Sequence, residues 1–319
     1  MGECSQGGCI VTESDTFRAG FAALVGRPNV GKSTLLNALV GEKLSIVTPR
    51  PQTTRHRITG LVNRPNLQIA FVDTPGLHVG GKRALNKAMN RTAASALADA
   101  DLVVLCLPDD AAKESAALAA SLGAQAPKLL DASTAHRVDP DWVYGLAELA
   151  PDQAAAIAAA SRVSNPGCYP TGAILMLRPL IDAGIMAPDF PVTVNAVSGY
   201  SGGGKSMIAA YEARTAPDFE LYGLALEHKH VAEMQKYTGL TRRPIFVPSV
   251  ADYAQGMIDS IPLHLVLLKG GVTPADLEAV LVKRYAGSDV VRVVTAEANG
   301  KLEPQALNGT NGLEIRVYG

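Results

Sequence analysis

The stretch that most constrains the fold is a glycine-rich loop between an apolar run and a helical pattern. The apolar run covers residues 21–25, the loop reads Gly-Arg-Pro-Asn-Val-Gly-Lys-Ser over residues 26–33, and the helical pattern covers residues 34–40 before Gly41. This is the G-x-x-x-x-G-K-[ST] spacing in the strand, loop and helix order that phosphate binding needs. Backbone N–H groups at such a helix start surround phosphate oxygens. The sequence therefore predicts an α/β domain with a mostly parallel sheet and a phosphate site.

Two later segments supply the other parts of a phosphate site. Thr54 lies in Pro-Gln-Thr-Thr-Arg, and an apolar run at residues 68–72 leads into Asp73-Thr-Pro-Gly76. We expect Ser33 and Thr54 to bind Mg²⁺ directly and Asp73 to hold it through water. The residues predicted to contact nucleotide phosphates are Gly26, Asn29, Val30, Gly31, Lys32, Ser33, Thr34, Asp73 and Gly76.

Four motifs in the first hundred residues resemble the Era family of ribosome-assembly GTPases. They read Gly-Arg-Pro-Asn-Val-Gly-Lys-Ser-Thr-Leu-Leu-Asn, Arg-Pro-Gln-Thr-Thr-Arg-His-Arg, Val-Asp-Thr-Pro-Gly-Leu-His and Lys-Arg-Ala-Leu-Asn-Lys-Ala-Met-Asn-Arg. The resemblance covers about residues 18–100 and implies GTP or ATP with Mg²⁺. A guanine-reading Asn-Lys-x-Asp is missing, because Asn86-Lys87 is followed by Ala-Met, and no Gly-x-x-Gly RNA-binding module follows. RNA is therefore not an expected partner.

Composition places the chain among globular proteins. It has 319 residues, 47% of them hydrophobic, and no apolar run near the ~20 residues of a membrane span. Residues 1–17 form a polar tail without a secretory pattern, so we expect disorder there and a cytoplasmic protein. Residues 1–100 carry 12 Lys and Arg against 6 Asp and Glu, a net charge of +6, and the rest carries 17 against 24, a net of −7. The basic part indicates phosphate or RNA partners or, equally, an ordinary solvated surface.

A second chemical centre lies at Ser-Asn-Pro-Gly-Cys168-Tyr-Pro-Thr, just before an apolar helical pattern at residues 171–183. A Cys at a helix start is exposed to N–H groups and the helix dipole, which favour thiolate, so Cys168 is a candidate nucleophile. A buried structural Cys is the alternative. His228-Lys-His230-Val-Ala-Glu233 offers an imidazole base and a carboxylate that could orient it.

The second part of the chain resembles N-acetyl-gamma-glutamyl-phosphate reductase in its shorter form. The motifs are Leu-Asp-Ala-Ser-Thr-Ala-His-Arg, Trp-Val-Tyr-Gly, the Cys168 loop, Val-Asn-Ala-Val-Ser-Gly-Tyr-Ser-Gly-Gly-Gly-Lys and His-Lys-His-Val-Ala-Glu-Met. The resemblance runs from about residue 100 to 319. It implies NADPH as cofactor, a small acyl-phosphate substrate, and a Rossmann domain followed by an α+β catalytic domain with an antiparallel sheet. We also expect a homo-oligomer.

The resemblance also implies roles for individual residues. Cys168 attacks the acyl phosphate to give a thioester, and His230, or His228 as second choice, is the acid and base. Arg137 and Ser133 bind substrate, and Pro108, Ser198 and Gly199 line the nicotinamide. The family's Gly-x-x-Gly-x-x-Gly cofactor loop is absent, and the GTPase-like loop stands in its place.

These two resemblances meet in the apolar run at residues 102–107, which predicts a strand buried on both faces of a parallel sheet. In both folds the first strand pairs with the fourth, so we expect residues 101–107 beside residues 21–25. The predicted domains are a tail at 1–17, a composite nucleotide-binding domain at 18–165 that is GTPase-like up to 100, and a catalytic domain at 166–319. The main interpretation is an acyl-phosphate reductase of arginine biosynthesis, impaired by the exchanged loop. The alternative is a truncated, fused Era-like GTP-binding protein.

The remaining elements predicted after the shared strand alternate between helix and strand. Helices are expected at residues 111–122 and 151–160, besides the one at 171–183, and strands at 128–131, 162–164, 192–198, 245–250 and 257–268. Thr273 and Pro274 predict a helix start with a threonine N-cap and an early acid at Asp276.

Overall fold

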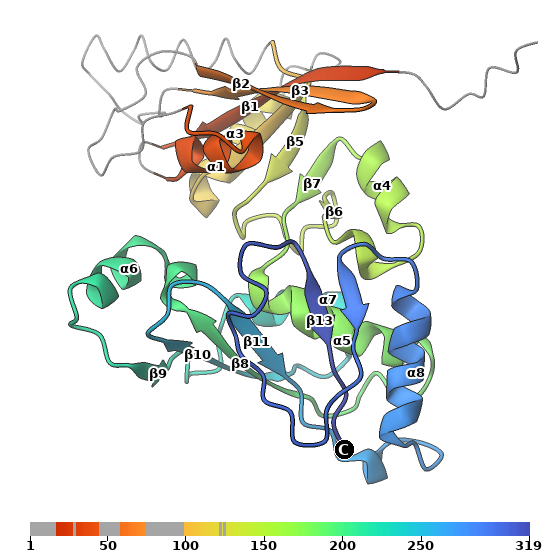
Figure 1. Cartoon of the computed structure of the whole chain (residues 1–319). Coiled ribbons are helices and arrows are strands. Elements are labelled where there is room, and N and C mark those ends of the chain that lie inside the picture. The colour runs from red at the N-terminus through yellow and green to blue at the C-terminus, as the bar shows by residue number, and fades with distance from the viewer. Residues whose placement is uncertain (1–16, 28–29, 45–57, 75–98, 121–122, 124–125) are drawn as a thin grey trace, which may run out of the picture. The chain divides into compact units, whose positions relative to one another are not determined.

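A computed structural model describes residues 17–27, 30–44, 58–74, 99–120, 123 and 126–319 (Figure 1). The chain divides into two compact units. The first comprises Met1–His136 with Ser161–Ser164, and the second comprises Arg137–Ala160 with Asn165–Gly319. The second unit thus begins at Arg137, and the chain returns briefly to the first unit at residues 161–164. Three predicted site residues, Asn29, Thr54 and Gly76, lie outside the described residues.

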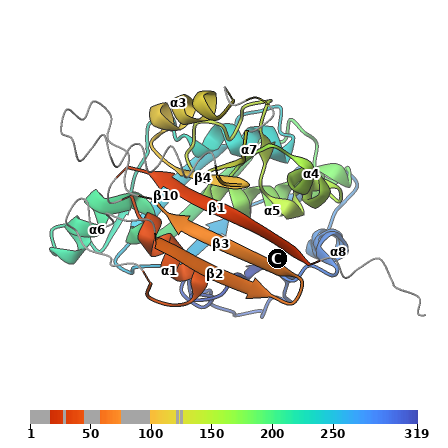
Figure 2. The ribbon, with the colours of Figure 1, turned by 90° about the horizontal axis from the view of Figure 1, so that it is seen from above.

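The first unit is built on a mostly parallel sheet with the strand order β2-β3-β1-β4-β5-β7. Figure 2 shows β2, β3 and β1 side by side; β2 runs antiparallel to β3, and the other pairs are parallel. The bounds are β1 Arg18–Gly26, β2 Ile58–Arg64, β3 Leu67–Asp73, β4 Leu102–Cys106, β5 Lys128–Asp131 and β7 Arg162–Ser164. The bounds of β5 and β7 are those predicted.

The predicted pairing of the first strand with the fourth is confirmed. Ala22 lies opposite Leu102 and Gly26 opposite Cys106 in a parallel ladder. The apolar run of β4 is buried over its three central residues, as a strand covered on both faces requires. Helix α1, Lys32–Val40, buries Leu36 in the core cluster that includes Ala22 and Val104. Helix α3 of this unit spans Asp109–Ala120.

The main sheet of the second unit has the order β11-β8-β10-β9. Its bounds are β8 Thr193–Gly199, β9 Phe219–Leu221, β10 Ile245–Ala251 and β11 Met257–Ser260. The outer strands are antiparallel to their neighbours as predicted, while the central pair, β8 and β10, is parallel. The strand predicted at 257–268 is wrong beyond Ser260, because Pro262 lacks the N–H that a ladder needs, and a 3-10 turn, η4, follows at Leu265–Leu267.

Helices pack on this sheet and form the core of the second unit. Their bounds are α4 Gln153–Ala159, α5 Cys168–Asp182, α6 Gly204–Glu212, α7 His230–Thr238 and α8 Pro274–Tyr285. The core joins residues of α5 and α7 to β8 and Phe246 of β10. Short elements complete the unit: β6 Val143–Tyr144, η2 Ala147–Leu149, η3 Tyr200–Gly203, and a small parallel sheet of β12 Val291–Val293 and β13 Leu313–Ile315.

The predicted start of α8 is confirmed by a full capping box. The Thr273 hydroxyl accepts from the Asp276 N–H, and Asp276 accepts from the Thr273 N–H, with Pro274 in the first turn. None of the helices in the described part of the chain combines the length and apolar character that a membrane crossing requires.

Candidate active site

The start of α5 positions Cys168. The helix begins at Cys168 itself, three residues earlier than the apolar pattern predicts, and Gly167 is its N-cap. The Thr171 hydroxyl and N–H both bond to the Gly167 carbonyl, which fixes the first turn. The side chain of Cys168 is exposed, whereas the rest of the helix is largely buried. The alternative of a buried structural Cys is therefore not what the structure shows.

Glu233 of α7 holds the backbone in front of Cys168. Its buried carboxylate, 2% exposed, accepts from the Gly167 N–H at 2.9 Å, the Tyr144 hydroxyl at 2.8 Å and Arg137 Nη1 at 2.9 Å. The expectation that Glu233 orients an imidazole is wrong, because its hydrogen bonds go to these three groups. It acts instead on the loop and on the guanidinium.

Gly167 is the point where these groups converge. A Cβ there would lie 2.8 Å from Arg137 Nη1, 2.9 Å from Glu233 Oε1 and 2.9 Å from His230 Cδ2. Such contacts are shorter than a side chain permits, so only glycine lets all three approach the residue before the nucleophile. The Gly in the Pro-Gly-Cys sequence thus has a packing reason, since its φ of −70° is open to other residues.

Arg137 is held from both of its ends. The Tyr237 hydroxyl bonds to its carbonyl at 2.6 Å, and Glu233 binds Nη1. Its Nε is buried without a hydrogen-bond partner among the described residues. Arg137 also lines the cavity that holds Cys168, and its role toward substrate stays a prediction.

The two histidines lie against each other at the start of α7. Their ring centroids are 4.6 Å apart in an edge-on arrangement, and His228 Nδ1 accepts from the His230 N–H at 3.2 Å. Burial, then the neighbouring His228 and Arg137, lower the pKa of His230 to about 3. Its imidazole is therefore neutral near pH 7. Its Nδ1 is buried and has no partner in the described part of the chain.

The surroundings raise the pKa of the Cys168 thiol, contrary to the expectation from the helix start. The largest cause is the loss of hydration around the sulfur, because protein surrounds it although the residue keeps exposed surface; the Tyr169 N–H lowers the pKa, and the Asp259 carboxyl raises it. The helix-start N–H groups thus act in the predicted direction but are outweighed. Without ligand, Cys168 is a protonated thiol near neutral pH.

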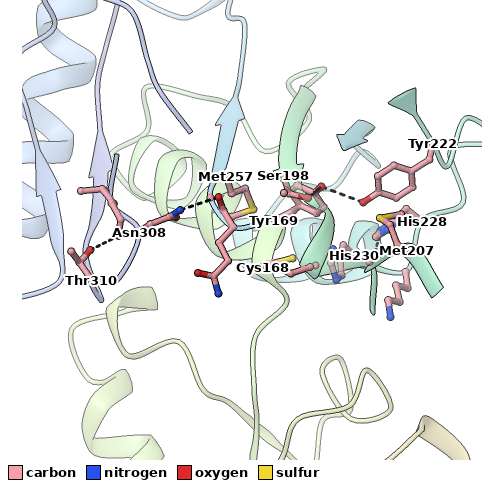
Figure 3. A pocket seen from close by; sticks show the side chains of 18 of the residues that line it. Cys168, Tyr169, Ser198, Met207, Tyr222, His228, His230, Met257, Asn308 and Thr310 are labelled. Carbon is pink, nitrogen blue, oxygen red and sulfur yellow. Dashed lines mark hydrogen bonds between the residues drawn. The ribbon is translucent and has the colours of Figure 1, made fainter. Parts of the chain in front are cut away.

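A cavity of about 880 Å³ brings most of the predicted catalytic residues of the second unit together (Figure 3). Cys168, His228, His230, Arg137, Ser198 and Gly199 all line it. Ser198 and Gly199 end β8, so the sheet presents them at its carboxyl edge. The sequence did not indicate the hydrogen-bond partners of Glu233. Nor did it indicate Tyr169 and Tyr222, which line the same cavity. The position of Tyr169 next to Cys168 was the one signal for them.

Two residues predicted to act with this group belong to the first unit. Ser133 follows β5, and its hydroxyl donates to Asp131 at 2.7 Å while accepting from the Ala135 N–H. Pro108 follows β4 and accepts from the Ala112 N–H at the start of α3. Their roles toward substrate and nicotinamide stay predictions.

The first unit carries the predicted phosphate loop at the carboxyl end of β1. Gly31 has a φ of 95°, a left-handed conformation that suits glycine, and it directly precedes α1. Lys32 is buried and donates to the carbonyls of Gly26 and Arg27 at 3.2 and 3.0 Å. Ser33 donates to Asp73 Oδ2 at 2.5 Å, so two of the three predicted metal-site residues meet. Among the other phosphate-loop predictions, Val30 is exposed and Thr34 lies in the first turn of α1.

Comparisons with known proteins match both parts of the chain. A model of the semialdehyde dehydrogenase dimerisation domain matches residues 168–319, and a model of the 50S ribosome-binding GTPase family matches residues 21–132. The GTPase match runs past residue 100 through β4 and β5. The two predicted resemblances are therefore confirmed.

The family follows from curated relatives that match most of the chain. N-acetyl-gamma-glutamyl-phosphate reductases of Brucella ovis and Brucella abortus are each 52% identical to the chain over 228 residues, which is 69% of this chain and 73% of theirs. The chain belongs to the N-acetyl-gamma-glutamyl-phosphate reductase family. The crystal structure of aspartate semialdehyde dehydrogenase II from Vibrio cholerae covers 94% of this family member and 88% of its own chain, with a TM-score of 0.62 and 13% identity. That similarity shows a shared fold.

Proposed function

We propose that the chain is an NADPH-dependent acyl-phosphate reductase that converts N-acetylglutamyl phosphate to its semialdehyde. The observation that supports this most is the exposed Cys168 at the start of α5, in one cavity with Arg137 and His230. Both the relatives' name and this arrangement point to acyl transfer to a thiol. The reductase role is favoured over the GTPase alternative, because the relatives at 52% identity are reductases.

The chemistry follows from the charges of these groups. The Arg137 guanidinium, which lines the cavity, binds the phosphate or carboxylate of the substrate. A bound dianion raises the pKa of the nearby His230, which then accepts the Cys168 proton. Sulfur attacks the acyl carbon, the bond to phosphate oxygen breaks, the phosphate leaves with the proton held by His230, and a thioester remains. NADPH supplies hydride to the thioester carbon when bound. The Cys168 thiolate that would remain after the aldehyde leaves would take a proton from solvent through His230.

The residues present fit the nicotinamide end of that cofactor better than its phosphates. Ser198 and Gly199 edge the cavity beside Cys168 and are the residues that would hold the ring. The loop of the first unit is a phosphate-chain loop with a lysine, not a dinucleotide turn. We also place the protein in the cytoplasm, in arginine biosynthesis and as a homo-oligomer, from its family.

Iodoacetamide is expected to label Cys168 before Cys106 and to stop acyl-phosphate-dependent phosphate release. Cys168 is exposed and Cys106 is only partly so, and the loss of hydration around each sulfur raises the pKa of both thiols. The labelling rate should climb with pH into the alkaline range, since the raised pKa keeps Cys168 protonated. Mass spectrometry locates the label, and Cys168→Ala and Cys106→Ala are matched controls. Earlier labelling of Cys106, or phosphate release by Cys168→Ala, would contradict the proposal.

Lys32→Ala is expected to abolish binding of a nucleoside triphosphate with Mg²⁺ by the first unit. Lys32 is the buried cation of the loop, and its ammonium can turn from two carbonyls to the terminal phosphates. Calorimetry with GTP and with ATP measures this, and Lys43→Ala, which removes an exposed lysine of the same unit, should change nothing. We expect similar affinities for GTP and ATP. A strong preference for GTP would mean that another segment reads guanine.

A further inference from the structure

A buried carboxyl lies between β11 and the start of α5. Asp259 of β11 stands opposite Ala196 of β8, which belongs to the core cluster that also contains Ala173 of α5. Residues opposite each other in an antiparallel pair point to the same face of the sheet, so Asp259 points toward α5. Both of its carboxyl oxygens are buried and have no hydrogen-bond partner among the described residues. The carboxyl is therefore shielded from water and receives no hydrogen bond from this part of the chain.

The helix makes room for this carboxyl with a glycine. A Cβ at Gly172 would lie 2.1 Å from Asp259 Oδ2, so the acid fills the space that a larger residue would take. Gly172 follows Cys168 by four residues in α5, and positions four apart lie on one face of a helix with Cβ atoms about 6 Å apart. Met257, two residues before Asp259 on the same face of β11, lines the cavity with Cys168 (Figure 3). The carboxyl and the thiol are thus neighbours, one helical turn apart.

The order in which these two groups ionise follows from their chemistry. An ordinary carboxyl has a pKa of about 3.9 and an ordinary thiol one of about 8.5. Burial raises the pKa of Asp259 well above its usual range, and the loss of hydration raises the pKa of Cys168 in the same direction. The carboxyl therefore keeps the lower pKa and ionises first. Its negative charge then opposes the formation of a second negative charge on the sulfur.

The elements that pack against Asp259 offer no cation to offset this repulsion. Strand β8 has no titratable side chain. On α5, burial raises the pKa of Tyr169, which stays a neutral phenol. Arg178 and Asp182 lie further along the helix and pair with each other at 2.6 Å.

The groups on the neighbouring segments do not change charge together with the thiol. Glu303, beside the Pro304 carbonyl that bonds to the start of β11, is exposed, and so is Lys229. Arg137 is a permanent cation paired with a carboxylate. Burial lowers the pKa of His228 and lowers that of His230 to about 3, so both rings are neutral above pH 7.

We propose that Asp259 makes the reactivity of Cys168 pH-dependent: once the carboxyl ionises, its charge holds the neighbouring thiol protonated. As the pH rises, the pair passes from neutral to one negative charge on the carboxyl, and the second charge forms on sulfur only against that repulsion. The inference concerns the thiol itself and does not depend on which substrate it serves.

The test is the pH dependence of iodoacetamide labelling at Cys168, quantified by mass spectrometry, in wild type and in Asp259→Asn. Asparagine keeps the shape of the acid without its charge. The midpoint of the labelling profile should fall by about one pH unit, the size expected for two charges about 7 Å apart in a partly hydrated site. Asp189→Asn, which removes an exposed carboxyl of the same unit, should leave the midpoint where it is.

Asp259→Val is a second uncharged variant and should give the same shift, so the result does not depend on how one substitution folds. A folded Asp259→Asn or Asp259→Val protein with the wild-type midpoint would overturn the inference. Because iodoacetamide needs no substrate, this outcome is distinct from a failure of the reductase proposal, which a wild-type protein unable to reduce acyl phosphate would show.

Urea unfolding of the wild type tests the buried state of the carboxyl without any variant. The pKa of Asp259 is higher in the folded than in the unfolded protein, so its contribution to stability is complete below the unfolded pKa and is lost as the pH rises toward the folded pKa. Over that window the unfolding equilibrium constant should rise up to about tenfold for each pH unit, the effect of one proton. Asp259→Asn should remove this rise and Asp189→Asn should keep it. A wild-type rise that Asp259→Asn retains in full would also overturn the inference.

Discussion

Glu233→Gln is expected to lower the free energy of unfolding by about 3–5 kcal/mol, the cost of leaving a buried ion-pair partner uncompensated. The carboxylate serves three donors at once, from Arg137, Tyr144 and the Gly167 backbone. A glutamine keeps one acceptor oxygen but turns an N–H₂ group toward donors. It also leaves the Arg137 guanidinium without its counter-charge.

Urea unfolding of the full chain measures this loss, and Glu227→Gln is the matched control. Glu227 also pairs with an arginine, at 2.9 Å to Arg243, but its side chain is 74% exposed. That exposed pair should contribute about 0–1 kcal/mol. Iodoacetamide labelling of Cys168 should change in Glu233→Gln and not in Glu227→Gln, because only Glu233 holds Gly167. Equal destabilisation by both substitutions would contradict the proposed role.

NADPH is expected to bind at least about a hundredfold more weakly than a dinucleotide site allows, because two or three charge-assisted phosphate hydrogen bonds, each worth roughly 1.5–3 kcal/mol, are missing. The loop at β1 is shaped around a phosphate chain, and the Lys32 ammonium lies inside it against two carbonyls. Acylation of Cys168 should be unaffected, since that residue lies in the other unit. The result is slow turnover by an enzyme whose thiol still reacts.

Steady-state reduction of N-acetylglutamyl phosphate at increasing NADPH measures this defect. Reduced nicotinamide mononucleotide, which lacks the adenosine half, is an informative control. An intact dinucleotide site strongly prefers NADPH, whereas here the two donors should give similar rates. A micromolar KM for NADPH would show that the loop accepts a dinucleotide after all.

Sequence patterns predicted the elements that local chemistry determines. The strand and helix around Lys32 follow from residue type and spacing, the pairing of β1 with β4 follows from the two folds that the chain resembles, and the structure confirms both. The capping box at Thr273 is equally local. The antiparallel strand β2 was not predicted, because it alternates poorly and depends on β3 for its pairing.

The partners of buried polar groups could not be predicted, because they come from distant parts of the chain. Glu233 receives bonds from residues 66, 89 and 96 positions away, and Tyr169 lies 29 and 53 positions from its two hydroxyl neighbours. Because Glu233 and His230 are close in sequence, an interaction between them was expected. In the fold, the Glu233 carboxylate instead accepts hydrogen bonds from other segments of the chain. The pKa of Cys168 was misjudged for the same reason, since burial depends on tertiary packing.

The chain passes from the first unit to the second at residue 137, returns for residues 161–164, and leaves again. β7 therefore joins the first sheet only after a stretch of the second unit has been synthesised. There it pairs with one edge of β5. A fragment ending at residue 136 would present β5 as a bare edge open to pairing with other chains. A fragment starting at residue 166 would lack the segment that holds Arg137 and Tyr144, two of the three donors to Glu233. No single cut leaves both the first sheet and the donors to Glu233 intact, so the two units can be tested separately only by substitution.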